Sequence, residues 1–409
     1  MKKVIIRKTE EIENWRRNIN SEINFIPTMG NLHNGHIKLI STAKNDNSNV
    51  NLVSIFINPL QFDNKLDLEN YPKTIDNDIK ISFSNGADAI FIPSNEDIYP
   101  PNNKNIKFLK APIELSSALC GLNRIGHFDG VCTVVYRLLN LIKPKNLYLG
   151  EKDWQQLLIL KNLVLRKKLN VAIKSIPTQR DFDGIPLSSR NVHLSKNERK
   201  LISFFSSELL EAKKNFQQDK KINLNQIIKK LSAKKISIEY LEHLHPHTLQ
   251  KARLEDNISL LAGAIRCGET RLIDHVFLMK RRPIIAIDGP AGSGKSTVTK
   301  LIAKKLKLLY LDTGAMYRAL SWLMIKESID YKKEKKLQNI LKDISIVFKS
   351  NTNSHQDVYV NNYCVTEEIR SQKISSIVSK ISSIKEVRKF LVEEQRKIGE
   401  SGGLVAEGR

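Results

Sequence analysis

Pro27-Thr28-Met29-Gly30-Asn31-Leu32-His33-Asn34-Gly35-His36 decides the fold of the N-terminal part of this chain. The residues before it, 23–27, are apolar and short enough for a buried strand, and the residues after it have helical spacing. A turn containing Gly between such a strand and a helix predicts a βα unit. Continuous apolar strands alternating with helices predict a doubly wound, Rossmann-like parallel α/β sheet that binds ligands at the carboxyl ends of its strands. Further along the chain, the same pattern predicts strands at 50–57, 87–92, 146–149 and 171–176 and a helix at 154–167.

The pattern changes twice after this sheet. Two helices are predicted at 196–217 and 223–233, followed by short apolar segments up to residue 277, which together predict a small α+β subdomain. Residues 280–283 read as a linker, and a new strand begins at Ile284. We therefore expect three structural units, at residues 1–177, 178–280 and 281–409.

The third unit opens with Gly289-Pro290-Ala291-Gly292-Ser293-Gly294-Lys295-Ser296, which fits the pattern GxxxxGK[ST] between a strand and a helix. In such a loop, backbone N–H groups and the positive end of the helix bind phosphate oxygens. The lysine reaches the β and γ phosphates, and Ser296 can ligate Mg²⁺. This motif predicts an ATP site made by Gly289, Gly292, Gly294, Lys295, Ser296 and Thr297.

The first motif contains His33 and His36 with Gly35 between them, at a strand-to-helix junction. Attack on an α-phosphate builds negative charge, which two imidazoles and the free N–H groups of a helix start can stabilise. Gly35 lets a nucleotide approach the backbone. A pair of histidines at this spacing also fits a zinc pair or two surface residues, and the motif by itself leaves these alternatives open.

Three further segments, 58–62, 150–156 and 187–191, place polar residues where an open α/β sheet binds ligands, and 124–131 adds a fourth stretch to the set. With the first motif, their order and spacing closely resemble pantothenate synthetase (pantoate–β-alanine ligase), over residues 1 to about 278. The resemblance implies a nucleotidylyltransferase-type sheet and a two-step reaction. Pantoate would attack ATP to give pantoyl adenylate and pyrophosphate, and the amine of β-alanine would then displace AMP.

The resemblance also implies roles for individual residues. His33 and His36 would bind the ATP phosphates, with His36 stabilising charge and donating a proton, and Lys152 and Arg190 would neutralise the triphosphate. Pantoate and β-alanine would be bound by Gln61, Gln156, Arg124 and His127, of which the glutamines suit hydroxyl groups. The expected ATP contacts are Met29, Gly30, His33, Gly35, His36, Gly150, Glu151, Lys152, Asp153, Gln179, Leu187, Ser188, Ser189 and Arg190. Mg²⁺ is expected to accompany the ATP.

The third unit resembles the cytidylate kinases in four stretches, at residues 308–318, 365–370, 386–391 and 407–409. The resemblance implies that Lys295 is catalytic. It also implies that CMP or dCMP is bound by Thr313, Arg318, Ser379, Arg388 and Arg409. In that family Gly-Arg is followed by Asp-Ile-Gly-Thr and an Arg-rich lid, whereas this sequence stops at Arg409. We therefore expect a C-terminally truncated kinase that is weak or inactive, because phosphoryl transfer depends on positioning and on cations around the phosphate. The alternative is a non-catalytic nucleotide-binding module that stabilises the ligase.

The 409 residues carry a net charge of +23, with 66 Lys and Arg against 43 Asp and Glu. The excess is spread over the chain and interleaved with acids, so we expect no nucleic-acid partner. No apolar run is long enough for a membrane span or a signal peptide, which predicts a cytoplasmic protein without a membrane partner. The four cysteines are far apart and are expected to be buried thiols. His243, His245 and His247 have a spacing that could hold a metal, but a structural or incidental role is expected for them. The ligase family implies a homodimer.

Overall fold

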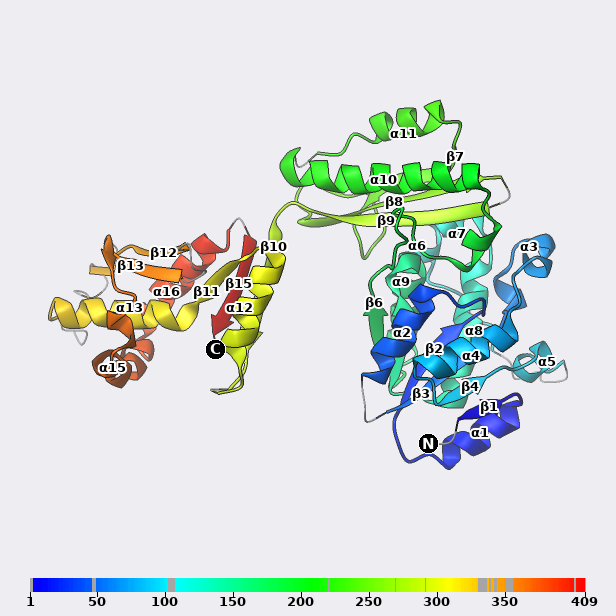
Figure 1. The fold of residues 1–409 in the computed structure, drawn as a ribbon, viewed down its shortest axis with the longest axis horizontal. Coiled ribbons are helices and arrows are strands. Elements are labelled where there is room, and N and C mark those ends of the chain that lie inside the picture. The colour runs from blue at the N-terminus through cyan, green and yellow to red at the C-terminus, as the bar shows by residue number, and fades with distance from the viewer. Residues whose placement is uncertain are drawn as a thin grey trace. The chain divides into compact units, whose positions relative to one another are not determined.

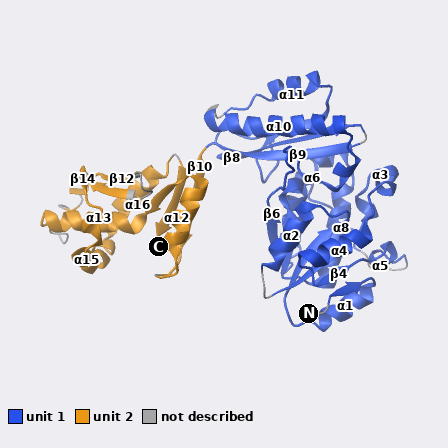
Figure 2. Ribbon diagram, viewed as in Figure 1, with its two compact units in different colours: residues 1–280 blue, residues 281–409 orange. Residues whose placement is uncertain are grey.

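A computed structural model describes residues 3–45, 49–101, 107–219, 221–268, 270–290, 292–329, 337, 340–341, 344–350, 356–400 and 402–408. The chain divides into two compact units, Met1–Lys280 and Arg281–Arg409, which Figure 2 shows in blue and orange. Each unit has its own sheets and its own buried core.

A six-stranded parallel sheet, in the order β1-β4-β3-β2-β5-β6, forms the centre of the first unit (Figure 1). After β2, the strands β3 and β4 are placed on one side of it, and β5 and β6 are then placed on its other side. This reversal places a switch point beside β2, where open α/β sheets bind ligands. The strands are β1 (Val4–Ile6), β2 (Ile23–Thr28), β3 (Val50–Ile55), β4 (Ala89–Phe91), β5 (Asn146–Gly150) and β6 (Ala172–Ile176).

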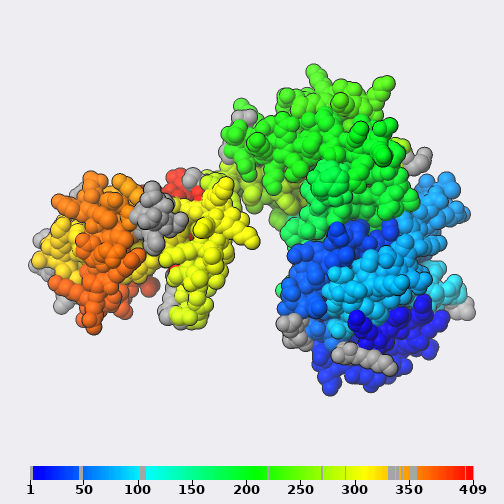
Figure 3. Space-filling view, in the orientation of Figure 1, coloured from blue at the N-terminus to red at the C-terminus, as the bar shows by residue number. Residues whose placement is uncertain are grey.

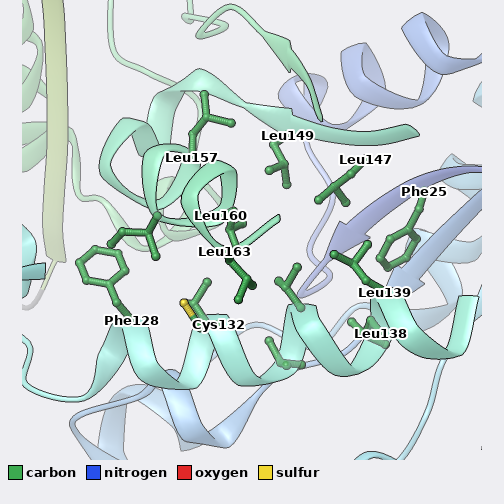
Figure 4. Close-up of a cluster of buried hydrophobic side chains, with 14 of the residues drawn as sticks. Phe25, Phe128, Cys132, Leu138, Leu139, Leu147, Leu149, Leu157, Leu160 and Leu163 are labelled. Atoms are coloured by element: carbon green, nitrogen blue, oxygen red, sulfur yellow. The ribbon is translucent and has the colours of Figure 1, made fainter. Parts of the chain in front are cut away.

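Helices cover both faces of this sheet, as predicted for a doubly wound fold. One face buries the apolar sides of α2 and α4, and the other packs against α1, α8 and α9. Figure 4 shows Phe128, Cys132, Leu138 and Leu139 of α8 facing leucines of α9 and residues of the sheet. The helices are α1 (Thr9–Arg17), α2 (Asn34–Lys44), α3 (Lys65–Glu69), α4 (Ile75–Asn85), α5 (Asn95–Ile98), α6 (Ile113–Ser116), α7 (Cys120–Asn123), α8 (His127–Ile142) and α9 (Trp154–Arg166).

An antiparallel sheet of β7, β8 and β9 follows, with α10 and α11 packed against it. Leu244, Leu249, Leu260 and Ala262 from this part join the same apolar cluster as α8 and α9. In the space-filling view, the green residues lie directly on the blue and cyan ones of the same unit (Figure 3). The elements are α10 (Lys196–Asp219), α11 (Leu224–Ala233), β7 (Ser237–Leu244), β8 (Ile258–Cys267) and β9 (Thr270–Met279).

The second unit has a parallel sheet in the order β10-β15-β11 and an antiparallel sheet of β12, β13 and β14. Its core gathers around α13, with residues of α15 and α16. The elements are β10 (Arg282–Asp288), α12 (Lys295–Leu306), β11 (Leu309–Asp312), α13 (Thr313–Lys326), β12 (Ile346–Ser350), β13 (Gln356–Val360), β14 (Tyr363–Cys364), α15 (Gln372–Ser382), α16 (Lys385–Ile398) and β15 (Gly402–Gly408).

Two sequence-based expectations differ from the structure. The expected linker at 280–283 already contains the start of β10, because Arg282 pairs with Gly402 of β15 in the parallel sheet. Cys120, Cys132 and Cys267 are buried as expected, but Cys364 is exposed because the short strand β14 leaves its side chain open to solvent. Within the described ranges, no helix is both long and apolar enough to cross a membrane.

Candidate active sites

The loop after β2 is fixed by Asp78, a fully buried carboxylate on α4. Its Oδ2 accepts the backbone N–H of Asn31 at 2.9 Å, and its Oδ1 accepts that of Leu32 at 2.8 Å. Thr74 donates its hydroxyl to the same carboxylate. Asp78 therefore holds the backbone that leads into His33, and it is a residue that the motifs of the sequence did not identify.

The histidine pair forms the first turn of α2, with ring centroids 4.1 Å apart. His33 Nδ1 accepts the N–H of Gly35, and His36 Nδ1 accepts the N–H of His33. A Cβ at residue 35 would lie 2.8 Å from the His33 ring, so Gly35 is required for this approach. Because both Nδ1 atoms are acceptors, each neutral ring carries its proton on Nε2.

Burial lowers the pKa of His33 to about 4, with Lys152 as a second cause. It lowers the pKa of His36 to about 3, with His33 as a second cause. Both rings are therefore neutral near pH 7 in the ATP-free protein. In this state they can donate hydrogen bonds from Nε2 to a phosphate, whereas the proton transfer expected of His36 would require a charged ring.

The turn after β5 carries Lys152 and Asp153, which form an ion pair of 3.2 Å. Burial would raise the pKa of Asp153, but Lys152 lowers it below its usual value. Glu151 faces β6 and accepts a hydrogen bond from Ser175. Lys152 is the cation of this turn that lines the cavity described below.

Residues 188–190 reach the first motif through Ser189, whose hydroxyl donates to the carbonyl of Asn31 at 3.0 Å. Asn31 Nδ2 in turn donates to the carbonyl of Ser189 at 2.8 Å. Arg190 pairs with Asp67 of α3, with an Nη2–Oδ2 distance of 2.9 Å, and lies over the ring of Tyr71. The two hydrogen bonds between Ser189 and Asn31 thus join residues 188–190 to the first motif.

The segment before Ser188 is anchored by a bidentate ion pair between Arg180 and Asp274 of β9, with both N–O distances at 2.7 Å. Asp274 is buried, and Arg180 also donates to the carbonyl of Gly184. The sequence analysis missed this pair, because the two residues are 94 positions apart and lie in no motif.

Three of the residues predicted to bind the acids, Gln61, Arg124 and His127, contact one another. Asn58 donates to Gln61 Oε1 at 3.1 Å and accepts from Tyr99, which orients the Gln61 amide. His127 Nδ1 donates to the carbonyl of Gln61 at 2.6 Å, and its Nε2 accepts from Arg124. Burial, followed by the charge of Arg124, lowers the pKa of His127 to about 4. Asn58 follows a predicted strand and is a further residue that the sequence analysis did not select.

A cavity of about 280 Å³ joins these groups. Gly30 and Glu151 are outside its lining, and Gly30 instead donates its N–H to Thr28. The other predicted ligase-site residues line it: Met29, His33, Gly35, His36, Gln61, Arg124, His127, Gly150, Lys152, Asp153, Gln156, Gln179, Leu187, Ser188, Ser189 and Arg190.

In the second unit, the loop after β10 leads into α12, whose N-cap is Gly294 with φ 81°. Lys295 Nζ donates to the carbonyl of Pro290 at 2.8 Å. Ser296 donates its hydroxyl to Glu407 Oε1 at 2.6 Å. A hydroxyl beside a carboxylate at the phosphate end of a P-loop suits Mg²⁺, which prefers oxygen ligands. Glu407 was quoted in the sequence analysis but given no role.

The predicted CMP residues that the structure describes lie on the helices α13, α15 and α16. Thr313 donates to the carbonyl of Glu407 at 2.7 Å, and Arg318 pairs with Asp312 at 2.9 Å. Ser379 lies on α15, and Arg388 on α16 donates to the carbonyl of Ser382. Both Ser379 and Arg388 are exposed. The predicted residue Arg409 falls outside the described part of the chain.

The three clustered histidines have contacts of their own. His243 Nε2 lies 2.7 Å from the hydroxyl of Ser259, and His245 Nδ1 accepts the N–H groups of His247 and Thr248. Across the parts of the chain that the structure describes, no group of three or more His, Cys, Asp or Glu residues is placed to hold a metal ion.

Comparison with known proteins covers both units. The family model for pantoate-beta-alanine ligase matches residues 4–277, and the one for cytidylate kinase matches residues 285–409. The bifunctional pantoate ligase/cytidylate kinases of two Prochlorococcus marinus strains, MIT 9215 and NATL1A, are 97% and 48% identical to this chain. The matches span the whole chain and 80% of the length of each relative.

Two solved structures resemble the chain over about two thirds of its length. The pantoate-beta-alanine ligase of Francisella tularensis, complexed with beta-gamma ATP and beta-alanine, is 38% identical with a TM-score of 0.58. The match covers 68% of this chain and 98% of that one. The corresponding ligase of Thermus thermophilus is 32% identical with a TM-score of 0.60, covering 67% and 98% of the two chains. This chain is therefore an enzyme and belongs to the bifunctional pantoate ligase/cytidylate kinase family.

Proposed function

We propose that residues 1–280 condense (R)-pantoate with β-alanine at the cavity beside β2, through a pantoyl-adenylate intermediate. The observation that carries this proposal is the convergence of three segments on one cavity. Two neutral imidazoles, Lys152 and Arg190 lie together there, and the two amides of Gln61 and Gln156 line the same space. The imidazoles and the two cations suit a triphosphate, and the two amides suit a hydroxy acid.

In the first step, a carboxylate oxygen of pantoate attacks the α-phosphorus of ATP, and the bond to the bridging oxygen of pyrophosphate breaks. Negative charge grows on the α-phosphate oxygens. The Nε2–H groups of His33 and His36 donate hydrogen bonds to these oxygens, and Lys152 and Arg190 neutralise the departing pyrophosphate. The positive end of α2 adds to the same effect, because His33 is its N-cap.

In the second step, the amine of β-alanine attacks the acyl carbon of pantoyl adenylate, and AMP leaves with the electron pair of the broken C–O bond. Asn58 orients the Gln61 amide, whose Nε2 donates one N–H to Met29 Sδ at 2.8 Å. Its second N–H would hold an oxygen of the acid. Arg124 and His127 fix the backbone of Gln61 from behind. Ser188 and Ser189 keep Arg190 beside the phosphates.

We propose that residues 281–409 bind ATP at the P-loop and CMP or dCMP beside Thr313 and Arg318. Lys295 would bind the transferred phosphate, and Ser379, Arg388 and Arg409 would complete the acceptor site. Mg²⁺ supplies charge neutralisation of ATP in both units when it is bound, and Ser296 and Glu407 would hold it in the second. A homodimer formed through the ligase part and a cytoplasmic location complete the proposal. We also propose that the ligase part consists of a sheet domain, residues 1–177, and a smaller subdomain, residues 178–280.

The test incubates the full chain with ATP, Mg²⁺ and pantoate, with and without β-alanine, and separately with CMP. Pyrophosphate, AMP and ADP are followed. We expect AMP only when both acids are present, and ADP with CMP. Absence of AMP would refute the ligase proposal. Tight binding of ATP to residues 281–409 without ADP formation would favour the alternative, a nucleotide-binding module that stabilises the ligase.

A further inference from the structure

The side chain of Ser54 lies on β3 and is 1% exposed. Its Oγ has no hydrogen-bond partner within the described chain. Buried hydroxyls are normally paired, because leaving one unpaired forfeits its hydrogen bonds to water without replacement. The neighbouring Thr28 hydroxyl does not pair with it, since that group donates to the carbonyl of Ser54 at 2.8 Å.

Ser54 also lines the ligase cavity. Among the residues that the structure describes, five others have a buried side-chain N or O atom without a partner, and none of them lines this cavity: Ser82, Arg137, Asn162, Asn191 and Ser206. The unpaired hydroxyl of Ser54 therefore coincides with the place where a substrate binds. A missing partner at such a place is most simply supplied by the ligand.

The wall around Ser54 is apolar. The same cavity is lined by Pro27, which pairs in register with Ser54, and by Phe56, Val131, Val135 and Leu138. Pantoate has two methyl groups on C3, a hydroxyl on C2 and a terminal hydroxyl on C4. The two methyl groups require an apolar wall, and the terminal hydroxyl lies at the opposite end of the molecule from the carboxylate that must reach the α-phosphate.

We propose that Ser54 is a specificity-determining residue of the ligase, whose hydroxyl pairs with the terminal C4 hydroxyl of pantoate. The inference rests on the proposed ligase function and adds to it a contact that selects the acid. Gln61 and Gln156 are then left for the oxygens near C1 and C2. A site that buries a hydroxyl for one substrate group discriminates strongly against acids that lack this group, because its own hydroxyl stays unpaired.

The test compares pantoate with its 4-deoxy analogue, 2-hydroxy-3,3-dimethylbutanoate, and with its 2-deoxy analogue, 4-hydroxy-3,3-dimethylbutanoate, in the full chain. Formation of AMP in the presence of β-alanine gives kcat/KM for each acid. The wild type should prefer pantoate to the 4-deoxy analogue, and Ser54→Ala should reduce this preference about tenfold or more, the effect of losing one buried hydrogen bond. The loss should fall on kcat/KM for pantoate, while the 4-deoxy analogue is used as well as before.

The melting temperature of the substrate-free protein distinguishes a role of Ser54 in specificity from a role in the fold. An unpaired hydroxyl contributes nothing to the free protein, so Ser54→Ala should leave the melting temperature unchanged or higher. The matched control is Ser82→Ala on α4, which also removes a buried, unpaired hydroxyl but does not line the cavity. It should leave the preference for pantoate unchanged.

Three results would overturn the inference. In the first, Ser54→Ala lowers the melting temperature and keeps the preference, which means that the hydroxyl serves the fold. In the second, Ser54→Ala loses the preference for pantoate over the 2-deoxy acid, which means that the Ser54 hydroxyl pairs with the hydroxyl on C2. In the third, the wild type does not distinguish pantoate from the 4-deoxy acid. If the wild type forms no AMP from pantoate at all, it is the ligase function itself that fails.

Discussion

Arg190 donates to both carboxylate oxygens of Asp67, with Nη2–O distances of 2.9 and 3.2 Å. A residue expected to neutralise the triphosphate is therefore already neutralised by α3 in the ATP-free protein. Arg124 is engaged in the same way by Asp63, at 3.0 Å. The segment from Asp63 to Asp67 thus occupies two cations of the site with carboxylates, and the anionic substrates must compete with it.

This competition predicts that Asp67→Asn tightens the binding of ATP. The variant removes the negative charge that pairs with Arg190, so the dissociation constant of ATP should fall about 1.5-fold to fivefold, the range for partly exposed ion pairs. Isothermal titration with a non-hydrolysable ATP analogue measures it. Asp63→Asn is the matched control, since it frees Arg124 and should change the KM for pantoate instead. Weaker ATP binding by Asp67→Asn would show that Asp67 positions Arg190.

Loss of His36 or Lys152 should remove stabilisation of charge in the adenylation step. We expect His36→Ala and Lys152→Ala each to reduce turnover about 10²-fold or more. Pyrophosphate release in the presence of pantoate is the measurement. Lys145→Ala is the control, because this exposed lysine lies at the opposite end of β5. Near-wild-type rates in either active-site variant would place the active site elsewhere.

Asp78 accepts two backbone N–H groups of the loop before His33, so its replacement should affect stability and turnover together. Asp78→Asn keeps one acceptor oxygen and leaves one N–H unpaired, at a cost of about 1–3 kcal/mol in the free energy of unfolding. The KM for ATP should rise as well. Asp88→Asn is the comparison, because Asp88 also accepts a backbone N–H, from Asn51, at the other end of β3. This variant should lose stability only.

The elements near β2 could be predicted from the sequence because their signals are local. The apolar run of β2, the turn and the helical spacing of α2 are contiguous, and the P-loop of the second unit has the same property. Family resemblance supplied the other segments, and their expected residues meet at one cavity. Local pattern and resemblance thus identified groups that line one cavity.

The residues that support these groups could not be predicted in this way. Asp78 and Asn31 are 47 positions apart, and Asp67 and Arg190 are 123 apart. Asp67 lies on the short helix α3 and Asp78 in the acidic first turn of α4. A solvated surface role is the simplest interpretation of such residues from the sequence. The contact of each exists only once the sheet has brought two distant loops together. A buried, unpaired hydroxyl such as that of Ser54 gives no sequence signal at all, because serine in a strand is ordinary.

In the second unit, Glu407 accepts from both Ser296 and Tyr310. Glu407→Gln removes the charge that would hold Mg²⁺ beside the P-loop, so the Mg²⁺ concentration needed for half-maximal nucleotide binding should rise about tenfold. Binding of a fluorescent ATP analogue, titrated with Mg²⁺, is the readout. Glu394→Gln on α16, which removes an exposed ion pair with Lys397, should leave the titration unchanged. An unchanged titration in Glu407→Gln would assign this carboxylate to the fold.

Four buried histidines of the first unit should make its stability depend on pH. Burial lowers the pKa of His33, His127 and His275 to about 4 and that of His36 to about 3. In the unfolded chain a histidine titrates near pH 6.5. Between about pH 6.5 and 4, the unfolded chain therefore binds protons that the folded chain does not. The free energy of unfolding should fall as the pH is lowered through this window.

Urea unfolding between pH 7.5 and 5 measures this slope. Trp322→Phe leaves Trp15 and Trp154 as reporters of residues 1–280. His275→Gln in that background should flatten the slope, because the glutamine cannot take up a proton in either state. His275 on β9 is suited to this test because its ring packs against those of Trp154 and Phe277. It is also not one of the residues predicted to bind a substrate. A slope identical to that of the parent would mean that His275 binds its proton equally in the folded and unfolded chains.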